Sequence, residues 1–229
     1  MTSLQKWGKS VRTTIPVMAG YLVLGAGFGI LLRTRGYGLG WALAMSAFIY
    51  AGSMQYVAID LLTGGASLLT TAVTTLLVNA RHLFYGISML ERYRAAGKYA
   101  PYLIFSLTDE TYSLVAARED LTGAECFRIS LLDQLYWVLG TALGSLAGAY
   151  LDFNTTGIDF SLTALFLTVF TEQWLETKNH APALIGLGVS IVCCLLFGAD
   201  SFLLPTMGGM LCCLLVLDAR RTKKGGESV

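Results

Sequence analysis

The residues with the clearest capacity for chemistry stand together at Asn79, Arg81 and His82. They end an uncharged run, residues 61–80, that is long enough to cross a lipid bilayer, and an apolar pattern resumes directly after them. A charge at membrane depth costs roughly 3 kcal/mol on insertion scales, so it persists where it meets a partner, a cavity or a substrate path. The planar guanidinium of Arg81 suits a carboxylate, and His82 can carry a proton between about pH 5 and 8. The alternative is that Arg81 reaches the lipid headgroups and His82 follows it.

A second polar group, Thr108-Asp109-Glu110-Thr111, interrupts another hydrophobic segment. Adjacent residues lie on different faces of a helix, so Asp109 and Glu110 do not form a paired acid–base dyad. Either carboxylate can neutralise Arg81 or relay protons. A helix end at the membrane interface explains these acids equally well.

A third group is Tyr50-Ala51-Gly52-Ser53-Met54-Gln55. Its small residues permit close backbone approach, and Tyr50, Ser53 and Gln55 offer neutral hydrogen bonds. This combination can hold a zwitterion, or it can serve a helix–helix interface. Weaker candidates are Asp133, and Glu172 and Gln173 beside an interfacial tryptophan.

The elements that must position these residues are predicted to be transmembrane helices. The chain has 229 residues, of which 55% are hydrophobic and only 14% charged, and its mean hydropathy is +0.61. Soluble domains carry about 25% charged residues. A spanning helix needs roughly 17–25 mostly apolar residues. Uncharged runs of about that length lie at 13–32, 36–59, 61–80, 134–151, 181–199 and 201–217, with weaker candidates at 99–117 and 160–175.

We therefore expect an all-α polytopic membrane protein of about seven or eight hydrophobic helices, forming a single transporter domain over residues 1–229. Gly25, Gly27 and Gly29 interrupt the first run and Gly64-Gly65 separates the second from the third, so some helices are expected to be broken or re-entrant. Close packing of small residues is the alternative explanation. Residues 36–55 and 157–174 share a pattern that suggests an internal repeat.

Basic residues predict which ends face the cytoplasm. Both short basic termini, 1–12 and 218–229, are expected to be cytoplasmic, which requires an even number of crossings. The loop holding Arg92, Arg94 and Lys98 conflicts with eight simple crossings, because these would place it outside. Either the charge rule is overruled there, or one segment near Asn79 is re-entrant or half-length.

Several function classes find no support. The net charge is +1 and no basic patch is interleaved with aromatic residues, so we expect no nucleic-acid partner. The five cysteines lack metal or redox spacing and are expected to pack in apolar helices, while two histidines are too few for a metal site. No hydrolase motif is present. We expect neither a cofactor nor a metal, and no enzymatic activity.

Taken together, these blocks resemble the AzlC family of branched-chain amino acid exporters. The similarity covers about residues 14–120 and rests on the order and spacing of motifs. These are Gly25-x-Gly27-Phe28-Gly29, Tyr50-Ala51-Gly52-Ser53-Met54-Gln55, Asn79-Ala80-Arg81-His82-Leu83-Phe84-Tyr85-Gly86 and Thr108-Asp109-Glu110.

The resemblance implies a large transporter subunit in the bacterial cell membrane. It implies export of leucine, isoleucine, valine or analogues such as methionine, driven by the proton gradient. It also implies a small AzlD-like membrane partner of roughly four spans.

The candidate residues could bind each part of an amino acid substrate. Arg81 or a helix N-terminus can meet the carboxylate, and Asp109 or Glu110 can meet the ammonium. Phe28, with Gly27 beside it, is a candidate for the apolar pocket, together with Tyr50. Two other functions remain open: an integral membrane enzyme, which turns over without a gradient, and a passive channel or structural subunit.

Overall fold

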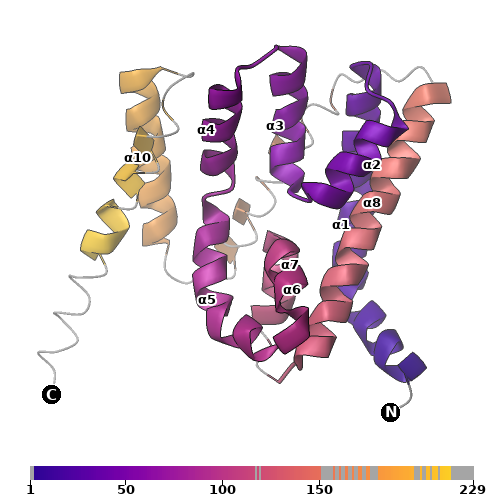
Figure 1. Cartoon of the computed structure of the whole chain (residues 1–229). Coiled ribbons are helices and arrows are strands. Elements are labelled where there is room, and N and C mark those ends of the chain that lie inside the picture. Colours follow the sequence, from indigo (N-terminus) through magenta and orange to yellow (C-terminus); the bar gives the residue numbers. More distant parts are fainter. Residues whose placement is uncertain are drawn as a thin grey trace, which may run out of the picture. The chain divides into compact units, whose positions relative to one another are not determined.

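A computed structural model of the chain consists of helices joined by short turns, and no strand occurs among the residues it describes (Figure 1). The structure describes residues 3–116, 118, 120–150, 180–198 and 212–217, together with residues 157, 160, 163–164, 167, 170–171, 174–175, 202, 205–206 and 208–210. Glu172, Gln173, the C-terminal basic residues 218–229 and most of the proposed repeat at 157–174 lie outside the described residues. The chain divides into two compact units, Met1–Leu162 and Thr163–Val229.

The first unit contains most of the described helices. They are α1 (Ser3–Thr34), α2 (Leu39–Phe48), α3 (Gly52–Thr63), α4 (Leu68–Val78), α5 (Arg81–Ala95), the 3-10 turn η1 (Gly97–Tyr99), α6 (Ala100–Phe105), α7 (Asp109–Ala116) and α8 (Gly123–Tyr150). The second unit contains α10 (Ala181–Phe197). Among the described helices, α1 alone is both long and apolar enough to cross a membrane, while α2, α4, α10 and Gly208–Leu217 are shorter apolar helices.

Helices α1 and α8 run parallel and form the scaffold of the first unit. Their glycines remove the side chains that would hold the two backbones apart. A Cβ on Gly29 would lie 2.2 Å from the Thr141 carbonyl oxygen, and a Cβ on Gly144 would lie 2.0 Å from the Ala26 carbonyl oxygen. Such small-residue contacts are typical of close helix pairs in membranes.

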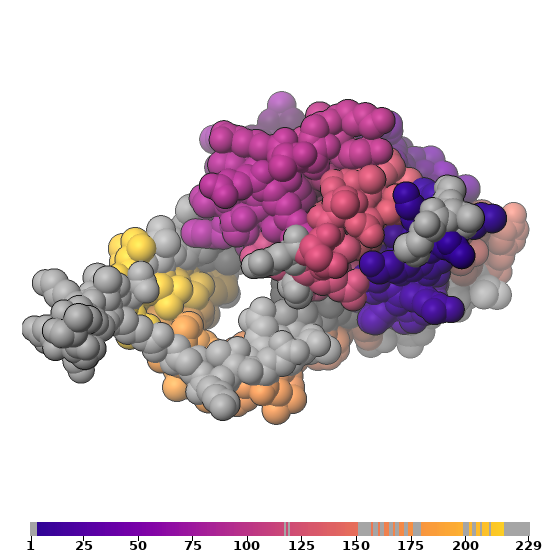
Figure 2. All heavy atoms as spheres, turned by 90° about the horizontal axis from the view of Figure 1, so that it is seen from below, coloured from indigo at the N-terminus to yellow at the C-terminus, as the bar shows by residue number. Residues whose placement is uncertain are grey.

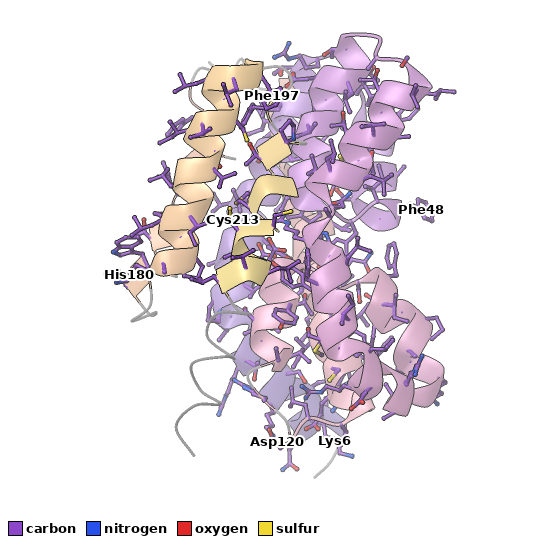
Figure 3. All side chains as sticks on the ribbon, turned by 90° about the vertical axis from the view of Figure 1, so that its left-hand side faces the viewer. Lys6, Phe48, Asp120, His180, Phe197 and Cys213 are labelled. Carbon is purple, nitrogen blue, oxygen red and sulfur yellow. The ribbon has the colours of Figure 1, made fainter. Side chains whose placement is uncertain are left out.

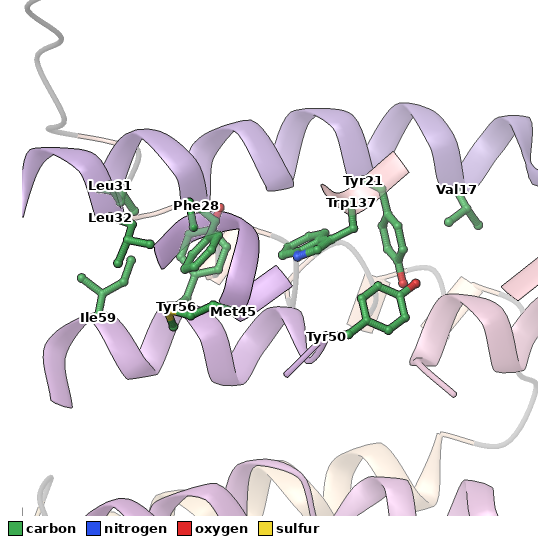
Figure 4. Packing of buried hydrophobic residues seen from close by; sticks show 11 residues of the cluster. Val17, Tyr21, Phe28, Leu31, Leu32, Met45, Tyr50, Tyr56, Ile59 and Trp137 are labelled. Atoms are coloured by element: carbon green, nitrogen blue, oxygen red, sulfur yellow. The ribbon is translucent and has the colours of Figure 1, made fainter. Parts of the chain in front are cut away.

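Helices α2 and α3 form a hairpin that enters from the upper end of Figure 1 and turns back at mid-height. Contacts along α1 fix the direction of α3, because Tyr50 lies beside Tyr21, Tyr56 beside Phe28 and Ile59 beside Leu32 (Figure 4). Thus α3 runs parallel to α1, and α2 leads from the upper end of α1 down to the turn. The uncharged run 36–59 is therefore two half-length helices.

Helices α4 and α5 follow one another downward and are separated by a short break at Asn79 and Ala80 (Figure 1). A second hairpin, α6 and α7, then enters from the lower end. Tyr102 in α6 donates to Gln134 at 2.6 Å, while Thr111 in α7 donates to Asp133 at 2.9 Å. The tips of the two hairpins meet, since the rings of Tyr50 and Phe105 lie 6.4 Å apart.

The basic loop that conflicted with simple crossings lies at the same end as the N-terminus. Arg92 donates to the carbonyl oxygens of Val115 and Arg118, and Arg118 donates to Thr13 at 3.0 Å. Figure 2 looks onto this end and shows the start of α1 beside the start of α8, and Figure 3 places Lys6 and Asp120 there together. The 92–98 loop therefore lies beside the first half of α1, and residues 36–59, a single uncharged run in the sequence, form the α2–α3 hairpin.

The outer surface is strongly apolar. Large hydrophobic side chains are exposed on several helices. Examples are Phe48 (Figure 3), Leu68 and Leu195, which are 81%, 91% and 82% exposed. A water-soluble monomer rarely shows so much contiguous apolar surface. The surface is that of a protein surrounded by lipid.

We expect Gly29→Leu to destabilise the first unit by about 3 kcal/mol or more, because the new side chain meets backbone that cannot move aside. The matched control is Gly20→Leu on the same helix, where nothing lies within 4 Å of the added Cβ. Thermal unfolding of the two purified variants in detergent measures the difference. Equal unfolding temperatures would show that α1 and α8 do not pack through this seam.

Candidate functional site

Three helices begin at one place in the middle of the first unit. They are α3 at Gly52, α5 at Arg81 and α7 at Asp109, and the preceding helices α2, α4 and α6 end there. Each junction coincides with one of the sequence motifs. Helix starts carry unpaired N–H groups and a partial positive charge, and helix ends carry unpaired carbonyl groups and a partial negative charge.

Local backbone geometry explains two of the breaks. Tyr50 has a positive φ of 44°, a conformation that a non-glycine residue rarely adopts and that ends α2. Asn79 has φ −93° and ψ 2° at the end of α4, and its carbonyl oxygen accepts from the His82 N–H at 2.9 Å, which tightens the turn into α5.

The third break is capped by a threonine. The Thr108 hydroxyl accepts from the Thr111 N–H at 3.3 Å, and the Thr108 carbonyl oxygen accepts from the Tyr112 N–H at 2.8 Å. Asp109 and Glu110 then occupy the first turn of α7, where carboxylates are favoured by the helix dipole.

Arg81 joins the three helix starts. Its guanidinium forms an ion pair with Asp109 of α7 and donates to the Ser53 hydroxyl of α3 at 2.8 Å. The Arg81 and Asp109 side chains are 32% and 25% exposed, so the pair is enclosed by protein on most sides yet accessible from one. The sequence offered both Asp109 and Glu110 as partners of Arg81, and in the structure Asp109 forms the ion pair.

His82 points away from that pair, as its position on the helix predicts. Its Nδ1 lies 3.1 Å from the Asn79 carbonyl oxygen, and its ring meets the ring of Tyr85 edge to face with centroids 6.0 Å apart. The side chain of His82 lines a groove on the surface of the first unit.

A series of buried hydroxyl groups connects Glu110 with Asp133. The Tyr21 hydroxyl donates to Glu110 Oε2 at 2.7 Å and also lies 2.7 Å from the Thr108 hydroxyl. Thr108 and Thr111 hydroxyls are 3.1 Å apart, and Thr111 donates to Asp133 Oδ2. The importance of Tyr21 was not recognised from the sequence, although a tyrosine inside an uncharged apolar run is itself a signal.

Gln55 and Phe28 lie in the packed interior. The Gln55 amide donates to Ser46 at 3.1 Å and its carbonyl oxygen accepts from Trp137 at 2.9 Å, so it fastens α2, α3 and α8 together. Phe28 is fully buried and stacks between Tyr56 and Trp137 (Figure 4), while Gly27 is half-buried beside it. The geometry does not bring these candidates to the Arg81 pair.

An apolar groove of about 710 Å³ lies along α4 and α5, and the neighbours of Arg81 in the chain, Ala80 and His82, line it, whereas Arg81 and Asp109 do not. It runs along one face of α4 and α5 and is closed opposite by the tips of both hairpins. Its apolar lining includes Leu76, Leu83, Ile87, Ile104 and Phe105, and its polar lining includes Tyr50, Asn79 and His82. Asn79 Oδ1 is buried without a hydrogen-bond partner in the part of the chain that the structure describes. Ligand pockets typically have this character, mostly apolar with a few convergent polar groups.

Apolar helices and a polar centre built from helix breaks define a helical membrane protein of the transporter type. Comparison with known proteins identifies the family. The family model described as "AzlC protein" matches residues 16–151, and this chain belongs to the AzlC family.

Relatives across bacteria cover nearly the whole chain. The "Branched-chain amino acid transport protein AzlC" of Bacillus subtilis is 46% identical over 209 residues, covering 89% of this chain and 82% of the relative. An "Uncharacterized membrane protein" of Haemophilus influenzae is 42% identical, covering 92% and 87%. "Inner membrane protein YgaZ" of Escherichia coli is 26% identical, covering 90% and 87%. No solved structure matches the chain.

A double-mutant cycle tests the central ion pair. We expect Arg81→Gln and Asp109→Asn to show a coupling energy of about 1–3 kcal/mol, because both side chains are largely enclosed. The looser pair of Lys9 and Glu125, 3.8 Å apart and with Lys9 55% exposed, is the control and should give about 0–1 kcal/mol. Denaturant unfolding in detergent supplies the four free energies of each cycle. Additive effects at Arg81 and Asp109 would contradict the pairing.

Proposed function

We propose that the chain is the large subunit of a secondary transporter that exports branched-chain amino acids, with methionine as a close analogue. The observation that carries the proposal is the pairing of Arg81 and Asp109 at three converging helix starts, with an apolar groove lined by the adjoining Asn79 and Ala80. Family membership supports it, since the B. subtilis relative is named for branched-chain amino acid transport. The direction of transport, proton drive and a small AzlD-like partner are parts of the proposal that rest on the resemblance.

An amino acid zwitterion presents the same two charges as the Arg81–Asp109 pair. The substrate carboxylate would bind Arg81, and the positive N-terminal ends of α3, α5 and α7 would stabilise it further. The substrate ammonium would bind Asp109 together with Asn79 Oδ1, which has no hydrogen-bond partner among the described residues. The branched side chain would then extend toward the groove at Asn79 and Ala80, which line it and adjoin Arg81 in the chain.

This exchange of partners leaves no charge isolated. Breaking a buried ion pair by removing one partner costs about 3–5 kcal/mol, because the other charge stays behind uncompensated. A zwitterion replaces one ion pair by two, so Arg81 and Asp109 can separate without that cost. A molecule carrying only one of the two charges would leave either Arg81 or Asp109 unsatisfied, which gives selectivity for free amino acids.

For membrane topology, we infer a single transmembrane domain in which α1, α4–α5 and α8 cross the bilayer and the two hairpins enter halfway. The end that holds Lys6, Lys9, Arg12 and the 92–98 loop would face the cytoplasm by the positive-inside rule. A spanning element followed by a half-length hairpin occurs twice with opposite direction, as in inverted repeats of transporters. A cytoplasmic C-terminus then requires an odd number of crossings after α8.

Cysteine labelling tests the first hairpin. In a background without native cysteines, we expect Arg35→Cys and Ala66→Cys to react with an impermeant reagent from the outside, because α2 and α3 do not cross. Lys6→Cys and Lys98→Cys serve as controls and should react only from the cytoplasmic side. Labelling of positions 35 and 66 from opposite sides would show that residues 36–59 span the membrane.

Efflux of labelled leucine tests the function itself. Proteoliposomes holding this chain and its small membrane partner should release leucine, and Arg81→Lys should reduce the rate at least about tenfold. That loss corresponds to one charged hydrogen bond, because lysine keeps the charge but not the planar fork. Arg33→Lys at the upper end of α1 is the control. Release by Arg81→Lys at the wild-type rate would exclude Arg81 as the carboxylate ligand.

A further inference from the structure

We infer that Glu110 and Asp133 share one proton through the hydroxyl groups of Tyr21, Thr108 and Thr111, and that this proton is the one coupled to transport. The inference deepens the proposed function and rests on it for the coupling. The shared proton itself follows from counting hydrogens along the chain of contacts. These five residues are called the hydroxyl chain below.

The hydroxyl chain contains four consecutive oxygen–oxygen contacts at hydrogen-bond distance. They measure 2.7 Å from Glu110 to Tyr21, 2.7 Å from Tyr21 to Thr108, 3.1 Å from Thr108 to Thr111 and 2.9 Å from Thr111 to Asp133. The three hydroxyl groups are buried, and Thr111 and Asp133 are fully enclosed. Buried polar groups of this kind are normally all hydrogen-bonded.

Each hydroxyl group carries one hydrogen, and an ionised carboxylate carries none. With both carboxylates ionised, Tyr21 donates to Glu110 and Thr111 donates to Asp133. Thr108 then has a single hydrogen for its contacts with Tyr21 and Thr111. One close oxygen–oxygen contact would be left without a hydrogen and would be repulsive. Four contacts therefore need a fourth hydrogen, and only a protonated carboxyl group within the chain can supply it.

The extra proton can be bound at either end of the hydroxyl chain. With Glu110 protonated, every hydroxyl group donates toward Asp133; with Asp133 protonated, every hydroxyl group donates toward Glu110. Passing from the first state to the second, Glu110 gives its proton to Tyr21, Tyr21 gives its own to Thr108, Thr108 to Thr111, and Thr111 to Asp133. Each hydroxyl group gains one proton and loses one, so the only net change is an ionised Glu110 and a protonated Asp133.

The surroundings of the two carboxyl groups differ. Glu110 is half-buried and lies near Arg81 of α5, Asp109 of its own helix and Tyr85. Asp133 is fully buried and faces Tyr50 at the tip of the first hairpin and Tyr102 of α6.

The two carboxyl groups also differ in the charged groups near them. Among the described residues, no cationic side chain pairs with Asp133, and its Oδ1 has no hydrogen-bond partner. A carboxylate so enclosed needs a proton or a nearby cation. The unpaired end of the hydroxyl chain therefore holds the proton whenever Arg81 stabilises a charged Glu110.

Arg81 links the substrate site electrostatically to the hydroxyl chain. A substrate carboxylate that binds Arg81 neutralises the charge that favours an ionised Glu110, so substrate binding draws the proton from Asp133 toward Glu110. By reciprocity, a proton on Glu110 favours substrate at Arg81. Proton position and substrate binding are thereby linked without any direct contact between the substrate and Asp133.

Infrared spectroscopy of the purified protein tests the shared proton independently of transport. At neutral pH we expect a carbonyl band of a protonated carboxyl group that disappears in the double variant Glu110→Gln, Asp133→Asn. Tyr21→Phe interrupts the hydroxyl chain and should shift the band, whereas the control Tyr56→Phe should not, because Tyr56 donates to the Leu24 carbonyl oxygen outside the chain. An absent band, a band that survives in the double variant, or a band that Tyr21→Phe leaves in place would overturn the inference.

Transport measurements test the coupling. In proteoliposomes, Thr111→Val should lower proton-gradient-driven leucine flux about 100-fold, the usual scale for a positioned proton-transfer group. Leucine exchange, which moves no net proton, should fall far less. Thr14→Val, also fully buried, is the matched control and should leave both rates unchanged. Equal loss of driven flux and exchange in Thr111→Val would overturn the coupling. If wild-type protein carries no leucine in either assay, the proposed function fails, while the infrared band still decides the shared proton.

Discussion

A helix that breaks inside a bilayer has to surround its broken ends with protein, because lipid offers no hydrogen bonds to the freed backbone groups. This protein meets that constraint by bringing three breaks to one place. The ends at Tyr50, Asn79 and Thr108 come together in the middle of the first unit, beside the scaffold of α1 and α8. The glycine seam at Gly29 and Gly144 holds the scaffold close enough for both hairpin tips to meet. Once the breaks are gathered there, three helix starts and three helix ends form a polar centre within an otherwise apolar molecule.

The polar centre contains two systems with different characters. The Arg81–Asp109 pair is partly exposed and offers one positive and one negative charge, which suits a zwitterionic ligand. The hydroxyl chain from Glu110 to Asp133 is buried, and no cationic side chain of the described residues pairs with Asp133 at its inner end. Asp109 and Glu110 are adjacent in the first turn of α7, yet each belongs to a different system. That division follows from helical geometry, since consecutive side chains point in different directions.

Much of this arrangement could be predicted from the sequence, because charges in apolar runs are costly and therefore conspicuous. Arg81 and Asp109 were identified on that basis, Ser53 was identified for its neutral hydroxyl group, and the three lie together. The pairing of helices could not be predicted in the same way. The run 36–59 is long enough to cross a bilayer, and no feature of its composition distinguishes one spanning helix from a hairpin of two short ones. The turn depends on the positive φ of Tyr50, which tertiary packing imposes.

Charge counting offered two explanations for the 92–98 loop: the positive-inside rule is overruled there, or a segment near Asn79 is re-entrant or half-length. In the structure residues 36–59 form the α2–α3 hairpin, and the chain also breaks at Asn79 into α4 and α5. Gln55 was selected for its polarity, but its amide is fully used in joining Ser46 to Trp137. Tyr21 was not among the residues selected from the sequence, and the distances to Thr108 and Glu110 reveal its position in the hydroxyl chain.

The central claim is that the site recognises both charges of a free amino acid, and ligand analogues test it most directly. Equilibrium binding of leucine, leucinamide and 4-methylpentanoate to the wild-type protein separates the contributions, since the amide lacks the carboxylate and the acid lacks the ammonium. The account predicts that both analogues bind at least about 100-fold more weakly than leucine, because each leaves Arg81 or Asp109 without a partner. Binding of either analogue as tightly as leucine would contradict recognition by the Arg81–Asp109 pair.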